Sequence, residues 1–222
     1  NAIFNDYDYS NEYVIIPQNT ALKGTMNTDT ITISYYYKKK ATVTVNYYKE
    51  GTTEKLADSD ILNKYYGDKY DVTSYKDNKN ISTDYKYVSY TSTPENTISG
   101  TVRQDTIIVN YYYVLKTATI NIKYLDELTN KSILNEENIQ TKYGVEYSSL
   151  NLDSYKKEIT GYDYSKTETT PKEISGKVNQ DTTTIIHYYK KKSNITIKYY
   201  DIETKKEIAK ENVDSKVHYG DI

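Results

Sequence analysis

Several residue types are missing or scarce in this chain of 222 residues. It contains no cysteine and no tryptophan, three prolines, two histidines and a single methionine. The lack of cysteine excludes disulfides, thiol chemistry and cysteine-ligated zinc. No apolar run approaches the roughly 20 residues that a membrane-spanning helix needs, so we expect no membrane insertion in this segment. Because the chain begins at Asn1 and shows no signal peptide, we expect it to be a piece of a longer protein.

An excess of charge of either sign is also lacking. The 29 basic and 31 acidic residues leave a net charge of −2, which provides no electrostatic basis for binding nucleic acid or an anionic membrane surface. Isoleucine, leucine, valine and phenylalanine together make up about a fifth of the chain, a proportion close to that of disordered proteins. The 29 tyrosines supply the apolar area that these residues do not. The composition therefore predicts small domains with shallow cores.

What the chain does contain is an internal repeat. Three related segments of strand-forming residues begin at Asp29, Asp105 and Asp181, at a constant spacing of 76 residues. Each aspartate follows a glycine by five residues, and one proline precedes each of these glycines. A fixed period with matched turn residues is the signature of tandem repeats. The expected boundaries are 1–40 for the back half of a repeat, 41–116 and 117–192 for two full repeats, and 193–222 for the front half of another.

Each of the three segments is expected to form a strand, a joint of three or four residues, and a second strand. In the middle copy Ile107, Val109, Tyr111 and Tyr113 alternate with polar residues and with Tyr112, which is the pattern of a half-buried strand. The joint is expected to be the boundary between two domains. Because the joints are so short, we expect each domain to contact only its neighbours, in an extended rod.

Two local features are predicted within each full repeat. A Tyr-Gly pair recurs at Gly67, Gly144 and Gly220, and the glycine predicts a turn that needs its backbone freedom. In the second repeat Leu152, Tyr155 and Ile159 have helical spacing, which predicts one short helix. The expected fold class is therefore β-rich α+β.

No residue pattern indicates an enzyme or a cofactor. His187 stands where the other copies have tyrosine, so we interpret it as a packing residue, and His218 has no catalytic partner at a recurring position. Acidic pairs such as Asp126-Glu127 change from repeat to repeat, as expected for a solvated face rather than a glycosidase or calcium site. The lysine runs 38–40 and 190–192 are interpreted as solvated linkers. We expect no metal, no cofactor and no catalysis.

At this point the residues resemble a known family. An opening strand of the form T-V-x-V-x-Y, a Tyr-Gly pair, a G-Y-x-Y and a closing D-T strand ending in tyrosines and lysines are similar to the MucBP (mucin-binding protein) repeats of Gram-positive surface proteins. The resemblance implies a β-grasp-like domain on a secreted, extracellular protein attached to the cell wall, with host or environmental glycans as partners. The expected Y-x-D-x-x-G opening is incomplete here, since Gly51 is present in one repeat only while Asp126 and Asp201 are present in the others.

The surplus of tyrosine suggests where such a glycan would bind. Tyr112 and Tyr188 on the closing strands, and Tyr48 and Tyr200 on the opening strands, are expected to point away from the core. They either cover the second face of the sheet or form a platform for sugar rings. Two functions stay open, a multivalent glycan-binding adhesin module and a structural stalk or fibre segment.

The two half repeats predict a further possibility. Each half alone leaves a strand edge unpaired and an apolar face in water, a state that favours pairing with another chain. Residues 193–222 contain an opening strand and residues 1–40 a closing strand. A homotypic head-to-tail assembly, in which two chains complete one domain, is one expectation. The other is that the flanking sequence of a longer array completes each half.

Overall fold

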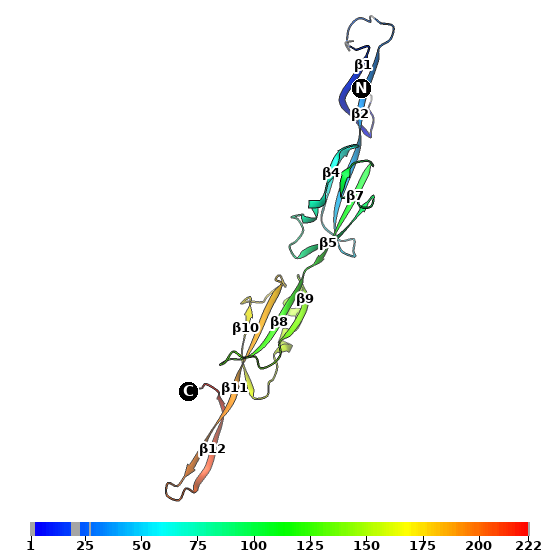
Figure 1. Ribbon diagram of the computed structural model, residues 1–222. Helices are drawn as coiled ribbons and strands as arrows, with labels where there is room; N and C mark the ends of the chain where they lie inside the picture. The colour runs from blue at the N-terminus through cyan, green and yellow to red at the C-terminus, as the bar shows by residue number, and fades with distance from the viewer. Residues whose placement is uncertain (1–2, 19–22, 27, 222) are drawn as a thin grey trace. The chain divides into compact units, whose positions relative to one another are not determined.

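The structure is a computed structural model that describes residues 3–18, 23–26 and 28–221 (Figure 1). It consists of two compact units, Asn1–Val114 and Leu115–Ile222. Within the described part of the chain, regular structure is almost entirely β-strand, and the only helical segments are three short 3-10 turns. None of the helices that the structure describes is long and apolar enough to cross a membrane. The strand-rich fold class expected from the sequence is confirmed at this level.

The first unit is organised around one long strand, β2 (Thr32–Lys49). Its first half pairs with β1 (Tyr7–Ile16), and its second half lies between β3 (Lys55–Tyr65) and β7 (Thr106–Leu115). The remaining elements are β4 (Lys69–Asp71), the 3-10 turn η1 (Thr73–Asp77), β5 (Tyr85–Thr93), which is the other neighbour of β7, and β6 (Ser99–Thr101), which pairs with β4.

The second unit repeats this plan around β11 (Thr182–Tyr200). Its first half lies between β10 (Tyr162–Thr170) and β8 (Thr117–Asp126), and its second half pairs with β12 (Glu207–His218). The outer neighbour of β8 is β9 (Glu137–Lys142), and two 3-10 turns, η2 (Tyr147–Leu150) and η3 (Leu152–Tyr155), follow it.

The expectation that the two lysine runs, 38–40 and 190–192, form linkers between domains is wrong. Residues 38–40 lie inside β2 and residues 190–192 lie inside β11, and both strands continue without a break. The alternation of side chains on both sides of each run is strand-like, so the charged segment extends the strand. A half repeat and the adjacent full repeat therefore share one strand in each unit.

The core of each full repeat is the buried face of a parallel strand pair. In the first repeat Val43, Val45 and Tyr47 on β2 pair in register with Ile107, Val109 and Tyr111 on β7, and all six side chains are buried. In the second repeat β8 and β11 pair in the same way. The predicted alternation of faces is confirmed, because the intervening residues are partly exposed.

The predicted helix in the second repeat is wrong, since residues 147–155 form two separate 3-10 turns. Asn151 between them has a left-handed backbone (φ +47°), and Lys156 after them is extended, so no continuous helix forms. Leu152, Tyr155 and Ile159 still pack against the core, as their spacing indicated. Spacing thus predicted which side chains are buried but not the backbone between them.

Tyrosine hydroxyl groups fasten this connecting segment to the sheet. In the first repeat the Tyr111 and Tyr113 hydroxyls donate to the carbonyl oxygens of Val72 (2.7 Å) and Lys76 (2.8 Å). In the second repeat Tyr124 and Tyr189 donate to the carbonyls of Tyr155 and Lys157. Burial raises the pKa of Tyr111 to about 12. Much of the tyrosine surplus therefore serves the core, where the ring is buried and the hydroxyl donates to a backbone carbonyl of the connecting segment.

The predicted Tyr-Gly turn is confirmed in all three copies. Gly67, Gly144 and Gly220 have φ values of +91°, +80° and +89°, a region that other L-residues rarely adopt. In the full repeats the glycine N–H donates to the carbonyl of a buried valine, Val102 or Val178. Each of the three prolines follows the end of a strand through a cis peptide bond.

Candidate functional site

The outer face of the sheet in the first full repeat carries a pair of tyrosines. Tyr48 on β2 and Tyr112 on β7 are direct neighbours in the parallel ladder. Their ring centroids are 6.2 Å apart, with an angle of 30° between the ring planes. Both side chains are partly exposed, on the side opposite the buried Tyr47 and Tyr111. The structure thus brings together two of the four tyrosines that the sequence suggested.

A continuous series of polar side chains crosses the same face, through the four strands β3, β2, β7 and β5 of the repeat's larger sheet. From β3 to β5 the series is Lys55, Ser59, Asn46, Asn110, Thr91 and Tyr112. At its centre the Asn46 amide donates to the Asn110 side-chain oxygen at 2.8 Å, and the Ser59 hydroxyl donates to the Asn46 oxygen at 2.6 Å. The Thr91 and Tyr112 hydroxyl oxygens are 3.2 Å apart. We call these residues together with Tyr48 the polar–aromatic face.

This arrangement suits recognition of a neutral, hydroxyl-rich ligand. The tyrosine rings offer flat apolar surface, and amide and hydroxyl groups beside them both donate and accept hydrogen bonds. Lys55 is the one charged group in the series. The side chains already hold one another in place, so little conformational entropy remains to be lost when a ligand binds. The Asn46–Asn110 contact was not anticipated, although the two residues stand at matching positions of the two central strands.

The second full repeat does not reproduce the polar–aromatic face. Tyr188 occupies the position of Tyr112, but its neighbour in the ladder is Leu125 instead of a tyrosine. The two asparagine positions hold Lys123 and Ile186. The Lys166 ammonium lies 4.9 Å from the centroid of the Tyr188 ring. Within the described residues, only the first repeat therefore has tyrosines at both of these neighbouring positions, which are Tyr48 and Tyr112.

Tyr200, the fourth candidate, lies at the end of β11 with half of its side chain exposed. It occupies the position of Tyr48 in the third copy, but a closing strand of the Tyr112 type does not lie beside it in the described structure. Its partner across the antiparallel ladder is Glu207. Tyr200 lies in the half repeat 193–222, whereas each of the other three tyrosines belongs to a full repeat.

His187 is a buried residue of the second core. Its Nδ1 lies 2.7 Å from the Thr167 hydroxyl, and its ring contacts Tyr124 and Tyr164. Burial, together with the positive charge of Lys156, lowers the pKa of His187, which therefore stays neutral in the fold near pH 7. These contacts agree with the interpretation of His187 as a packing residue.

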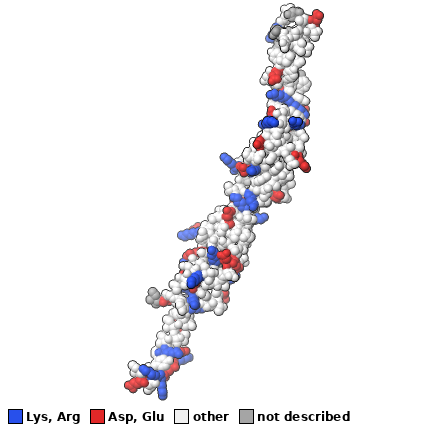
Figure 2. Space-filling model, viewed as in Figure 1, with Lys and Arg blue, Asp and Glu red and all other residues white. Residues whose placement is uncertain are grey.

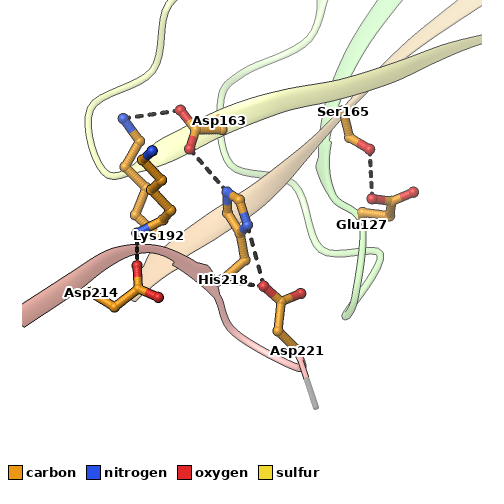
Figure 3. Close-up of polar contacts among 8 residues, drawn as sticks. Glu127, Asp163, Ser165, Lys192, Asp214, His218 and Asp221 are labelled. Atoms are coloured by element: carbon orange, nitrogen blue, oxygen red, sulfur yellow. Dashed lines mark hydrogen bonds and ion pairs between the residues drawn. The ribbon is translucent and has the colours of Figure 1, made fainter. Parts of the chain in front are cut away.

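His218 has partners that sequence reasoning missed. Its ring lies between two carboxylates, with Nε2 at 2.9 Å from Asp163 and Nδ1 at 3.5 Å from Asp221 (Figure 3). The Lys192 ammonium lies 3.0 Å from the other oxygen of Asp163. Hydrogen bonds from His218 and Lys192 lower the pKa of Asp163. These groups connect β10, β11 and the end of β12, so they hold the half repeat 193–222 to the second full repeat.

The first unit contains the same cluster at matching positions. Tyr65 replaces His218 and donates its hydroxyl to Asp8 at 2.9 Å, while Lys40 lies 3.0 Å from Asp8. The Tyr65 backbone N–H donates to Asp68, as that of His218 does to Asp221. The sequence signal that could have predicted these clusters is the Asp-Tyr pair that recurs at Asp8 and Asp163. Both clusters have a structural role in the middle of a shared strand, where the half repeat passes into the full repeat.

Carboxylates elsewhere also have structural partners. The Asp126 side chain accepts hydrogen bonds from the backbone and hydroxyl of Thr129, which lower its pKa. Glu137 pairs with Lys157, and its carboxylate lies 2.9 Å from the Tyr124 hydroxyl, which has one proton to share between Glu137 and the Tyr155 carbonyl. Within the described residues, no group of three or more His, Cys, Asp or Glu side chains is arranged to hold a metal ion. Figure 2 shows small groups of both charge signs separated by uncharged surface on the face in view.

Comparison with known proteins identifies the family. The model of the MucBP domain matches residues 42–114 and 119–190, and the chain therefore belongs to the MucBP family. Among solved structures, "Crystal structure of Mub-RV" is similar with 16% sequence identity and a TM-score of 0.25; the match covers 67% of this chain and 98% of that chain. No curated protein matches the chain at a significant level. The resemblance noted in the sequence is confirmed as family membership.

Proposed function

We propose that this chain is the repeat region of a secreted, cell-wall-attached bacterial surface protein that binds mucin-type or other glycans. The proposal rests on family membership and, most directly, on the polar–aromatic face of the first repeat. The mucin connection comes from the family name, and the extracellular location from the surface proteins in which such repeats occur. No catalytic step is part of this proposal.

The expected binding is weak at each site and strong only in combination. The polar–aromatic face lies on the outer face of a sheet, and a ligand on it leaves much of its own area in water, so few contacts contribute to affinity. Mucin-type glycans present many copies of the same sugar on one chain. Several weak sites on one surface protein, and many such proteins on one cell, then raise the apparent affinity through effective concentration.

The experiment measures binding of the whole 222-residue chain to immobilised mucin, with mucin stripped of its glycans as the blank. Replacing Tyr48 and Tyr112 by alanine is expected to abolish binding, because the paired rings are lost. The matched control is Tyr188→Ala, which removes the corresponding ring of the second repeat and is expected to leave most binding intact. Equal loss in both variants, or binding to stripped mucin, would count against the proposed site.

A structural stalk is the second candidate, and one observation favours it. Both β2 and β11 run unbroken from a half repeat into a full repeat, and charged clusters at Asp8 and Asp163 brace the same regions. Such continuity resists bending and requires no ligand. A chain that does not bind mucin, with its fold intact, supports the stalk.

We also infer a β-grasp-like arrangement for the full repeats. The strand order in the first repeat is β3-β2-β7-β5. The strands that come first and last along the sequence of the repeat, β2 and β7, are adjacent, parallel and central in the sheet. This order supports the inference, while the 3-10 turn η1 stands where a β-grasp domain has its helix. An experimental structure of one repeat tests the relationship, and a different strand order in that structure would contradict this inference.

A further inference from the structure

The first full repeat contains two stacked tyrosine pairs that differ in their access to solvent. Tyr47 and Tyr111 are neighbours in the parallel ladder between β2 and β7, and Tyr48 and Tyr112 are the next pair along it. The ring centroids are 6.4 Å apart in the first pair and 6.2 Å apart in the second. The first pair is buried, whereas both rings of the second are partly exposed. The two pairs therefore have similar geometry, but a reagent in solution reaches only the outer one.

The hydroxyl groups of the inner pair are also occupied. The Tyr47 hydroxyl donates to the Asp60 carboxylate, and the Tyr111 hydroxyl donates to the Val72 carbonyl. Burial raises the pKa of both inner tyrosines. Oxidation of a phenol removes the hydroxyl proton together with an electron, so burial and hydrogen bonding protect the inner pair from it. In the outer pair, the Tyr112 hydroxyl lies on the partly exposed face of the sheet.

The sheet holds the outer rings side by side before any reaction. Tyr48 and Tyr112 stand directly opposite each other on two parallel strands, and the angle between their ring planes is 30°. Two residues earlier on the same face, the Asn46 amide donates to the Asn110 side chain and ties the same two strands together. Exposed side chains rotate within picoseconds to nanoseconds. The ring edges therefore come into contact through side-chain rotation alone, without a change in strand register.

We propose that Tyr48 and Tyr112 form a site of oxidative cross-linking, at which a haem peroxidase and hydrogen peroxide join the two rings as dityrosine. The enzyme removes one hydrogen atom from each hydroxyl group, which leaves two phenoxyl radicals. Their unpaired electrons form a carbon–carbon bond between ring carbons next to the hydroxyl groups, and the hydrogen on each of these carbons moves to the oxygen. The protein loses two hydrogen atoms in total, and one peroxide is reduced to two molecules of water.

The bond would fasten the two ends of the repeat to each other. Tyr48 lies on the opening strand and Tyr112 on the closing strand, so residues 49–111, with β3, β4, β5 and β6, lie inside the covalent loop. A force transmitted along the chain would then pass from β2 to β7 through the bond. The second repeat lacks such a site, because Leu125 is the neighbour of Tyr188. This inference goes beyond the proposed function and does not depend on glycan binding.

The test treats the dilute 222-residue chain with a haem peroxidase and hydrogen peroxide, under conditions that convert free tyrosine to dityrosine. Monomeric protein is separated from cross-linked dimers, digested with trypsin and analysed by mass spectrometry. We expect the peptides 41–49 and 104–116 in one linked species, lighter than their sum by two hydrogen atoms. A monomer without this species would overturn the proposal.

Three phenylalanine variants locate the bond, because phenylalanine keeps the ring but has no hydroxyl hydrogen to lose. Tyr48→Phe and Tyr112→Phe are each expected to abolish the linked species. The matched control is Tyr111→Phe, which changes the inner pair within the same peptide and is expected to keep it. Hydrogen exchange of β2 and β7 before oxidation shows that each variant is folded. A linked species that persists in Tyr48→Phe, or that is lost in a folded Tyr111→Phe, would refute the assignment.

Thermal melting measures the consequence of the bond. Closing a loop of this length restricts the unfolded chain, so the linked monomer is expected to melt in its first unit at least about 10 °C above the untreated chain. Treated Tyr48→Phe is expected to melt as it does before treatment. Hydrogen exchange is expected to slow in β7 and to stay constant in β8 of the second unit. A linked chain with unchanged melting and unchanged exchange in β7 would refute the fastening of the two strands.

Discussion

The hydroxyl group of Tyr111 provides a sharp test of how the closing strand is oriented. The side chain is 1% exposed and donates to the Val72 carbonyl at 2.7 Å. Tyr111→Phe removes this bond and keeps the ring, with its contacts to Tyr87 and Tyr90. The Val72 carbonyl still accepts from the Tyr75 N–H, so it is not left without a partner. The expected loss is therefore that of one net hydrogen bond, about 1 kcal/mol.

For a domain the size of one repeat, 1 kcal/mol corresponds to a decrease in melting temperature of about 4–8 °C. Because the chain has two units, we would follow the first by hydrogen exchange of β7 in addition to thermal melting. Tyr112→Phe is the matched control, since its hydroxyl lies on the partly exposed face near Thr91. Its expected effect is within about 0.5 kcal/mol. If Tyr112→Phe destabilised the repeat and Tyr111→Phe did not, the assignment of faces would be refuted.

Three more predictions follow from titrating and charged groups. The first unit is expected to lose stability above about pH 10, because Tyr111 ionises there in the unfolded chain, while its pKa in the fold is about 12. Tyr111→Phe should therefore make the loss of stability with rising pH shallower. The second unit should lose stability below about pH 6.5, because His187 binds a proton in the unfolded chain but not in the fold, where its pKa is lowered. Denaturant melts of His187→Phe should lack this acid dependence. Asp163→Asn removes the partner of Lys192 and His218, so hydrogen exchange should rise in β12 and stay constant in β9; equal exchange in β12 would contradict its bracing role.

The regular part of the fold could be predicted from the sequence because its signals are local. A period of two identifies the buried face of each strand, and the constant spacing identifies the repeat. The turn at Gly67 could be predicted from a single residue type. These features depend on neighbours along the chain, which a sequence displays directly.

The misjudged features depend on partners that are distant or on competing local preferences. The helical spacing of Leu152 and Tyr155 indicated burial correctly, but the left-handed Asn151 between the turns interrupts the helix. Asp8 and Tyr65 are 57 residues apart, so their hydrogen bond has no local signature. The difference between the repeats is visible in the sequence, because Leu125 stands at the position of Tyr48, so Tyr188 has no tyrosine beside it in the ladder.

The central claim is that the polar–aromatic face of the first repeat binds a glycan. The most direct measurement is an NMR titration of the isotope-labelled 222-residue chain with a glycan released from mucin. We predict that the largest shift changes occur at Tyr48, Tyr112, Asn46 and Asn110, and that they saturate at a common concentration. Shift changes confined to other residues, or none at saturating glycan, would contradict the claim.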